Sequence, residues 1–290
     1  AGYAAARLSL ADPLKLIIGA RYTDWKSEGE GADRSHKVTT PYAGLVFDIN
    51  DTYSTYASYT EIFQPQTARD RSGGYLDPVD GKSYEIGVKG AWFDNRLNAS
   101  IAAFRIEQDN VAQVTSEPIP SRPGEFAYVA ARGTVSRGFE FELNGALTPN
   151  WQVGAGYTFA QAKYAKDADK AKEGRLFDTD LPRHLFKAST TYHLQGELKQ
   201  WRVGANLYSQ SATFNKGTNV FGQYHVDQDA YTLVGLMAGY QVNAHLDTQL
   251  NLNNVFDKKY YQGIASNSTW SPYDVFGDPR NFTLTAKYSF

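Results

Sequence analysis

The residue types that most often carry catalysis or bind metals are sparse in this sequence and poorly spaced for either task. The sequence has no cysteine, which excludes thiolate metal sites and disulfides. Ser189 and His193 stand four residues apart, about 13 Å along an extended strand, too far for the hydrogen bond of a nucleophile and its base. The histidines show no HxxxH spacing: His36, His184, His193, His225 and His245. We therefore predict no catalytic residue and no protein metal ligand.

Acidic residues and overall charge add no further chemistry. Asp167 and Asp169 are spaced like the first ligands of a calcium loop, but the glycine and the bidentate glutamate of such a loop do not follow. The formal net charge is −2 at pH 7, so the composition offers no attraction to nucleic acid. The useful chemistry of this chain must come from side chains that bind, and these need elements to position them.

Alternation in the last sixty residues identifies those elements as β-strands. Two sets of side chains alternate from 246 to 253, one mostly apolar and one polar: Leu246, Thr248, Leu250 and Leu252 against Asp247, Gln249, Asn251 and Asn253. A period of two places the two sets on opposite faces of a strand. The final strand, 279–290, repeats the pattern and ends on Phe290.

The same pattern predicts thirteen strands along the chain: 2–11, 14–27, 36–49, 52–63, 82–92, 96–115, 126–147, 151–165, 183–194, 199–214, 230–242, 245–260 and 279–290. Their connections alternate between short turns, as at Asn50-Asp51 and Asn243-Ala244, and long polar loops, as at 64–81 and 166–182. Short turns at one end and long loops at the other are typical of outer-membrane barrels.

Hydropathy and the placement of aromatic residues agree with a barrel. Mean hydropathy is −0.49, and no apolar run approaches the ~20 residues of a membrane helix, but barrel strands expose apolar groups only at alternate positions. Several aromatic side chains fall near predicted strand ends, where they suit a membrane interface: Tyr84, Trp92, Trp151, Trp201, Tyr240, Tyr260 and Tyr261. We predict an all-β fold, an antiparallel up-and-down transmembrane β-barrel.

The odd number of strands carries a further expectation. Single-chain bacterial barrels have even numbers of strands, and each unpaired backbone group in lipid costs several kcal/mol. Either the count is wrong by one, or strands precede residue 1, which we favour. The first residues also lack the basic region and apolar core of a signal peptide, so we expect an export signal upstream.

Several sequence blocks resemble those of one family. Residues 250–261 (LNLNNVFDKKYY) are similar to the penultimate-strand motif of TonB-dependent outer-membrane receptors. Residues 277–282 (GDPRNF), with the terminal Phe290, resemble their closing strand. Four further blocks resemble the ferric-siderophore branch, near the ferric-pyoverdine and ferric-coprogen receptors: 83–90, 136–140, 147–151 and 181–184.

This resemblance implies a 22-stranded barrel around an N-terminal plug, which imports an iron chelate across the bacterial outer membrane with energy relayed by TonB. Residues 1–290 would form the C-terminal portion of the barrel, about 13 strands, without the plug, the TonB-contacting segment or about nine strands. The implied partners are the ferric siderophore, the plug and remaining strands, TonB, the lipid bilayer and lipopolysaccharide. The iron arrives chelated, so no cofactor is implied. Phe290 would be the C-terminal assembly signal.

Two sets of site residues follow from the resemblance. The first lies on the polar faces of strands and is predicted to face the lumen, where it either solvates the wall or contacts the plug: Glu85, Lys89, Glu140, Glu142, Lys187, Arg202, Asp247 and Lys287. The second lies in external loops and is predicted to bind the ligand: Arg69, Arg71, Tyr75, Phe221, Tyr224, Trp270 and Tyr273. Aromatic faces can pack a chelate and arginine can meet its anionic oxygens. Loop packing or lipopolysaccharide contact are the alternatives for this second set.

Other functions remain open at this stage. A TonB-dependent receptor for another nutrient, or a passive porin, would use the same strands. These two alternatives differ from each other in whether a plug precedes the strands. A soluble or surface-attached β-protein that binds carbohydrate would instead bury the apolar face in a packed, aromatic-rich core.

Overall fold

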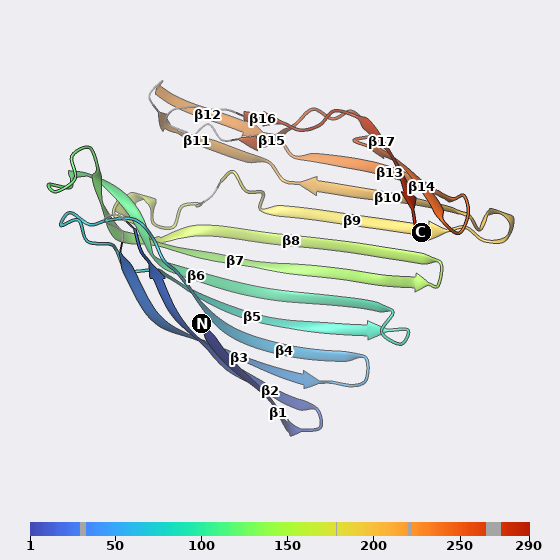
Figure 1. The fold of residues 1–290 in the computed structure, drawn as a ribbon, viewed down its shortest axis with the longest axis horizontal. Helices are drawn as coiled ribbons and strands as arrows, with labels where there is room; N and C mark the ends of the chain where they lie inside the picture. The colour runs from blue at the N-terminus through green and yellow to red at the C-terminus, as the bar shows by residue number, and fades with distance from the viewer. Residues whose placement is uncertain (30–32, 178, 220–221, 265–273) are drawn as a thin grey trace. The chain divides into compact units, whose positions relative to one another are not determined.

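The computed structural model describes five ranges of the chain: 1–29, 33–177, 179–219, 222–264 and 274–290. Within them, 13 strands form one sheet in the order β1 to β10, then β13, β14 and β17 (Figure 1). Two further sheets have two strands each, β11–β12 and β15–β16. No helix in these ranges is long and apolar enough to cross a membrane. The all-β prediction is confirmed.

The strand positions follow the predicted alternation closely. The first eight strands are β1 (Gly2–Ala11), β2 (Leu14–Ser27), β3 (Arg34–Asp48), β4 (Tyr53–Gln64), β5 (Val79–Trp92), β6 (Leu97–Pro118), β7 (Phe126–Thr148) and β8 (Trp151–Lys166). The remaining strands of the main sheet are β9 (His184–His193), β10 (Trp201–Gln210), β13 (Tyr231–Gln241), β14 (Leu246–Asn253) and β17 (Asn281–Tyr288). All but two of the strand ends lie within three residues of the prediction.

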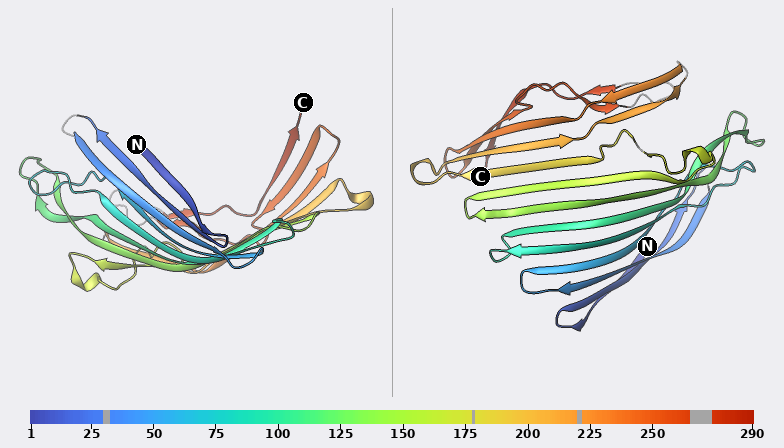
Figure 2. Two further views of the ribbon diagram at one scale, coloured as in Figure 1. Left: turned by 90° about the horizontal axis from the view of Figure 1, so that it is seen from below. Right: turned by 180° about the vertical axis from the view of Figure 1, so that it is seen from behind.

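The chain divides into two compact units, which are described separately. The first comprises Ala1–Lys89, Ala102–Gly138 and Gln161–Phe177, and the second comprises Gly90–Ile101, Phe139–Ala160 and Asp178–Phe290. In the first unit, β1 to β4 pair antiparallel in sequence order. In the second, β9, β10, β13, β14 and β17 do the same (Figure 2). The successive main-sheet strands named here are therefore direct neighbours in each unit.

Short turns close one end of the strands, and the chemistry of asparagine explains two of them. The Asn50 side-chain oxygen accepts hydrogen bonds from the backbone N–H groups of Thr52 and Tyr53, both at 2.9 Å. Asn243 accepts two in the same way, at 2.8 Å, from His245 and Leu246. Such bonds replace the backbone pairs that a turn interrupts. We call this end of the strands the turn end and the opposite end, where long connections lie, the loop end.

The two faces of the sheet in the second unit differ as the alternation predicts. Leu250 of β14 lies opposite Leu284 of β17, and these side chains are 46% and 71% exposed. Leu252 lies opposite Phe282, which is 75% exposed. The other face carries polar pairs, among them Asp247 opposite Lys287. We call these the apolar face and the polar face.

Burial in the described residues argues against a soluble fold. The buried hydrophobic residues there are few: Leu97, Ala102, Ile119, Ala127, Tyr231 and Ile264. Large apolar side chains are instead exposed on many strands, including Ile86 and Leu236. Soluble proteins expose only small contiguous apolar patches. No second sheet or helix packs on the Leu246–Leu252 row among the element contacts of the described residues, so the soluble carbohydrate-binding alternative loses its premise.

The strand predictions failed at four short strands that pair locally. The predicted loops 215–229 and 261–278 contain short strands instead, β11 (Thr213–Asn219) with β12 (Gly222–Gln228), and β15 (Tyr261–Ile264) with β16 (Asp274–Phe276). β12 contacts β15, so these small sheets lie side by side (Figure 1). These segments lack an apolar alternation and pair through their backbones.

Two predicted strands end earlier than expected, and the reason is clearest for β14. Asn254 and Asp257 adopt positive φ angles of 47° and 52°, which a continuing strand cannot contain. The Asn254 amide donates to the carbonyl oxygens of Lys258 and Asp278 at 2.9 and 3.0 Å. β14 therefore ends at Asn253 instead of 260. β10 likewise ends at Gln210 instead of 214, since Thr213 already belongs to β11. Short 3-10 turns occur at Lys170–Lys172 (η1) and Gly196–Leu198 (η2).

The two faces generate a stability prediction for the full receptor in lipid vesicles. Leu250→Arg puts a guanidinium on the apolar face in mid-strand and should lower the free energy of unfolding by about 2–4 kcal/mol. The matched change Asn251→Arg, one residue along on the polar face, should cost less than about 1 kcal/mol. Urea unfolding measures both. Equal losses for the two variants would contradict the assignment of faces.

Candidate functional site

At the loop end of the first unit, the connection between β4 and β5 holds two of the predicted ligand residues together. Arg69 and Tyr75 form an isolated antiparallel bridge, and the Arg69 guanidinium carbon lies 3.6 Å from the centre of the Tyr75 ring. Arg69 Nη1 donates to the Gly73 carbonyl at 2.7 Å, and Nη2 donates to the Tyr75 hydroxyl. Arginine and tyrosine thus present one joined surface.

The tip of this connection is held by its own side chains. The Asp70 carboxylate accepts hydrogen bonds from the Ser72 hydroxyl at 2.6 Å and from the Gly74 N–H at 2.9 Å. The hydrogen bond from the Ser72 hydroxyl is the main reason why the pKa of the Asp70 carboxyl is lowered. The Arg69 carbonyl also accepts from the Tyr128 N–H at 2.7 Å. These bonds fix the backbone from which Arg69 and Tyr75 project.

A second arginine, which the sequence did not single out, completes the arrangement. The Arg34 guanidinium carbon lies 4.5 Å from the Tyr75 ring centre and 5.0 Å from that of Trp25. Arg34 Nη1 donates to the Gln66 carbonyl at 2.6 Å, while its buried Nε has no hydrogen-bond partner among the described residues. We call Trp25, Arg34, Tyr75 and Arg69 the guanidinium stack. Cation–π contacts of this kind contribute about 0.5–2 kcal/mol each.

Of the other predicted loop residues, the two that the structure describes, Arg71 and Tyr224, do not join the stack. Arg71 forms an ion pair with Glu117 at 3.3 Å, with both side chains more than half exposed. Tyr224 lies on β12, where its hydroxyl donates to Asn215 at 3.3 Å and burial raises its pKa. The remaining three lie outside the described residues: Phe221, Trp270 and Tyr273.

On the polar face of the first unit, predicted charges gather around one tyrosine. The Tyr56 hydroxyl donates to Glu85, and Lys89 Nζ lies 4.5 Å from the centre of the Tyr56 ring. Tyr56 itself was not predicted, although its position in β4 on the same face as its neighbours Ser54 and Ser58 marks it as polar-facing. One tyrosine thus contacts a carboxylate through its hydroxyl and an ammonium through its ring.

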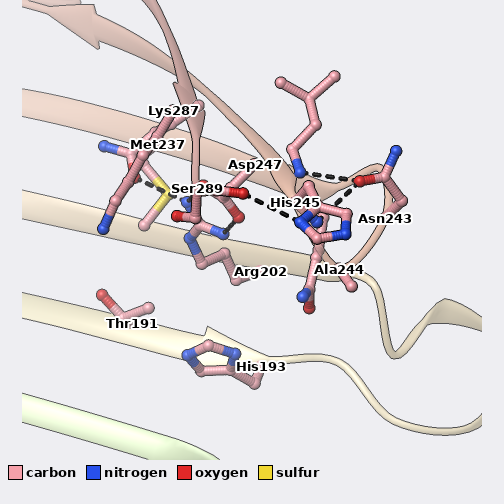
Figure 3. A pocket seen from close by; sticks show the side chains of 13 residues that line it. Thr191, His193, Arg202, Met237, Asn243, Ala244, His245, Asp247, Lys287 and Ser289 are labelled. Atoms are coloured by element: carbon pink, nitrogen blue, oxygen red, sulfur yellow. Dashed lines mark hydrogen bonds and ion pairs between the residues drawn. The ribbon is translucent and has the colours of Figure 1, made fainter.

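At the turn end of the second unit, three more predicted charges converge (Figure 3). Arg202 of β10 donates from both Nη atoms to the two carboxylate oxygens of Asp247 on β14, each at 2.7 Å. Arg202 Nη2 also reaches Gln249 at 3.2 Å. Lys287 of β17 lies directly opposite Asp247 in the register. A two-point bond of this kind fixes the orientation of the guanidinium as well as its position.

A glycine makes room for this arginine. Arg202 lies opposite Gly239 of β13, and a Cβ atom at Gly239 would stand 2.5 Å from the guanidinium carbon. The flat guanidinium therefore needs a bare backbone beneath it. Together with His193 and Lys287, the pair lines a cavity of about 480 Å³. Its polar lining suits contact with charged groups of another segment.

The other predicted polar-face residues are placed without such convergence. Lys187 Nζ lies 5.7 Å from the Tyr208 ring centre, Glu140 is half-buried and Glu142 is exposed. Phe290 is fully exposed, with its ring 5.2 Å from that of Tyr288. In the part of the chain that the structure describes, no three His, Cys, Asp or Glu side chains are grouped to hold a metal ion.

Comparisons with known proteins agree with this geometry. The family model described as TonB dependent receptor-like, beta-barrel, matches residues 1–255. The ferric-pyoverdine 358 receptor of Pseudomonas putida is 40% identical over 99% of this chain and 35% of its own length. The ferripyoverdine receptor of Pseudomonas aeruginosa is 37% identical over the same shares.

A solved structure gives the same likeness in three dimensions. The Pseudomonas aeruginosa outer-membrane ferripyoverdine receptor bound to ferripyoverdine shares 36% identity with this chain at a TM-score of 0.89. The match covers 99% of this chain and 38% of that one. The chain thus spans little more than a third of the length of these relatives.

Double-mutant cycles in the full receptor can measure the difference in strength between the Arg202–Asp247 and Arg71–Glu117 ion pairs. Arg202→Gln combined with Asp247→Asn should show a coupling free energy of about 1–2 kcal/mol, since the pair is two-pointed and partly shielded from water. Arg71→Gln with Glu117→Gln, the exposed pair, should show at most about 0.5 kcal/mol. Unfolding in urea supplies the values. Equal coupling in the two cycles would contradict the difference in geometry.

Proposed function

Because this chain belongs to the TonB-dependent receptor family, as part of its β-barrel, we propose that it forms the wall and external loops of a receptor that imports a ferric siderophore. The barrels of this family lie in the bacterial outer membrane. The observation that carries the proposal is the likeness to ferric-pyoverdine receptors along nearly the whole chain. A peptidic ferric siderophore of that kind is the ligand we propose.

The guanidinium stack supports this ligand class on chemical grounds. A ferric chelate presents anionic oxygens around the metal, and guanidinium groups bind such oxygens through charge-assisted hydrogen bonds. The Trp25 and Tyr75 rings can pack against flat parts of the chelate. We propose that Arg34 and Arg69 act with Tyr75 at the loop end, and that Arg71 contributes from the same β4–β5 connection. We further propose that Phe221 and Tyr224 contribute from the segment between β10 and β13, and Trp270 and Tyr273 from that between β14 and β17.

The charges on the polar face support a second part of the proposal. Several oriented charges are available to a domain enclosed by the barrel. They are Arg202 paired with Asp247, Lys287, and the Glu85 and Lys89 side chains that contact Tyr56. We propose that they contact a plug domain, and that Lys187, Glu140 and Glu142 do the same. Import against a gradient would then draw on TonB through that domain, as in the rest of the family.

Growth under iron limitation tests the proposed function. A strain that lacks its own siderophore receptors and carries the full-length gene should grow when supplied with ferripyoverdine as the iron source. The same strain without the gene should not grow. Rescue by an unrelated scarce nutrient, such as cobalamin, with no response to any ferric siderophore, would contradict the assignment.

The stack can be tested separately from transport. Tyr75→Leu removes the ring that both the Arg34 and the Arg69 guanidinium groups contact, so the full-length receptor should bind ferripyoverdine about tenfold more weakly, or ~1.4 kcal/mol. Tyr22→Leu, a change of the same kind on an exposed tyrosine of β2, should leave Kd unchanged. Fluorescence quenching gives both constants. Unchanged binding in Tyr75→Leu would exclude the stack from the ligand site.

A further inference from the structure

A second cavity of the second unit differs in its chemistry from both sites described above. It has a volume of about 450 Å³ and lies on the polar face, toward the loop end of β10, β13, β14 and β17. Tyr208, Tyr231 and Tyr260 form its aromatic part, and asparagine and glutamine side chains supply much of the rest. None of the predicted site residues that the structure describes lines it.

The tyrosines form one continuous aromatic surface. The rings of Tyr208 and Tyr231 are stacked with centres 5.9 Å apart, and those of Tyr231 and Tyr260 are 4.6 Å apart. Tyr231 is only 7% exposed, so the middle ring is fixed by its neighbours. A Cβ atom at Gly277 would stand 1.9 Å from Tyr260 Cζ, so the position of the third ring depends on a bare glycine backbone. Burial raises the pKa of Tyr260.

Amide groups surround this surface and are partly oriented in advance. Asn253 Nδ2 donates to Asn281 Oδ1 at 2.9 Å, and the Tyr208 hydroxyl donates to Gln210 at 2.7 Å. The Asn206 amide lies against the backbone of Gly235 and makes no hydrogen bond with the other described residues. Its donor and its acceptor are both available within the cavity. Such a group binds best to a partner that also both donates and accepts.

The charge of the lining excludes anionic partners. Among the described residues that line the cavity, Asp278 alone has a formal charge at neutral pH, and none is a lysine or an arginine. The ammonium of Lys187 lies over the Tyr208 ring but is not part of the lining. An anionic oxygen brought here would lose its hydration without meeting a cation, which is costly. The guanidinium stack offers the opposite environment.

We propose that this cavity is a ligand subsite for an uncharged arm of the siderophore, one that bears amide and hydroxyl groups, such as a peptide chain. The iron-chelating oxygens would be held elsewhere. Tyrosine faces pack the C–H surfaces of such an arm, and the Asn206 amide pairs with its N–H and C=O groups. The inference rests on the proposed function, since it takes the ligand of the receptor to be a siderophore.

An apolar and a cationic substitution of Asn206 in the full-length receptor test this subsite, with ferripyoverdine as the probe. Asn206→Leu should raise Kd about tenfold, and Asn206→Lys should raise it at least as much, because neither side chain can both donate to and accept from an amide. Asn144→Leu and Asn144→Lys, which alter a different cavity of the same unit, should leave Kd within twofold. Equal yields of folded receptor, judged by heat-modifiable migration, qualify each variant for comparison.

The outcomes separate the subsite from the proposed function. Tighter binding by Asn206→Lys would show that an anionic group occupies the cavity, and unchanged binding in all Asn206 variants would show that no part of the ligand does. Either result overturns the subsite while wild-type binding still supports a siderophore receptor. Failure of the wild-type receptor to bind any ferric siderophore would overturn both.

Discussion

Backbone hydrogen bonding between neighbouring strands is the constraint on which the rest of this structure depends. In hydrocarbon no water is available to pair with an exposed N–H or C=O group, so each strand must find its partners in the next. β2 and β3 show the result, a ladder without a register shift from Leu14 opposite Phe47 to Ser27 opposite Arg34. Once the ladder fixes the register, the face of every side chain in these strands is fixed too.

That sorting of side chains produces both the membrane surface and the binding chemistry. Exposed leucines and aromatics collect on the apolar face because each alternate position points there. Charged residues collect on the polar face, where they can pair with residues of nearby strands of the same sheet. Arg202 bonds to Asp247 across β13, and Gly239 of that intervening strand leaves the room that the guanidinium needs. A residue without a side chain is therefore as much a part of this site as the charges.

The sequence predicted the strands well because each carries its own periodic signal over eight or more residues. It failed for β11, β12, β15 and β16, which are too short to carry a sustained alternation and whose pairing is visible only through backbone bonds. A buried contact between them, from the Asn215 amide to the Ile264 carbonyl at 3.1 Å, joins residues 49 positions apart. No local pattern reports such a contact.

The candidate sites were predictable in part, for the same reason. Alternation placed Arg202, Asp247 and Lys287 on one face, but it could not show that the first two form a two-point bond across 45 residues. Arg69 and Tyr75 lie near each other in sequence and were found together. Arg34 was assigned to a loop, although it begins β3, and its contact with Tyr75 depends on the fold of the β4–β5 connection. The tyrosine cavity was missed because its rings come from separate elements.

The central claim is that one face of these strands meets hydrocarbon and the other meets an aqueous interior. Spin labels placed one at a time at positions 246–253 of the full-length receptor in lipid vesicles test it most directly. Collision with dissolved oxygen should peak at 246, 248, 250 and 252, and collision with a water-soluble nickel complex should peak at 247, 249, 251 and 253. Accessibility that does not alternate with a period of two would contradict the account.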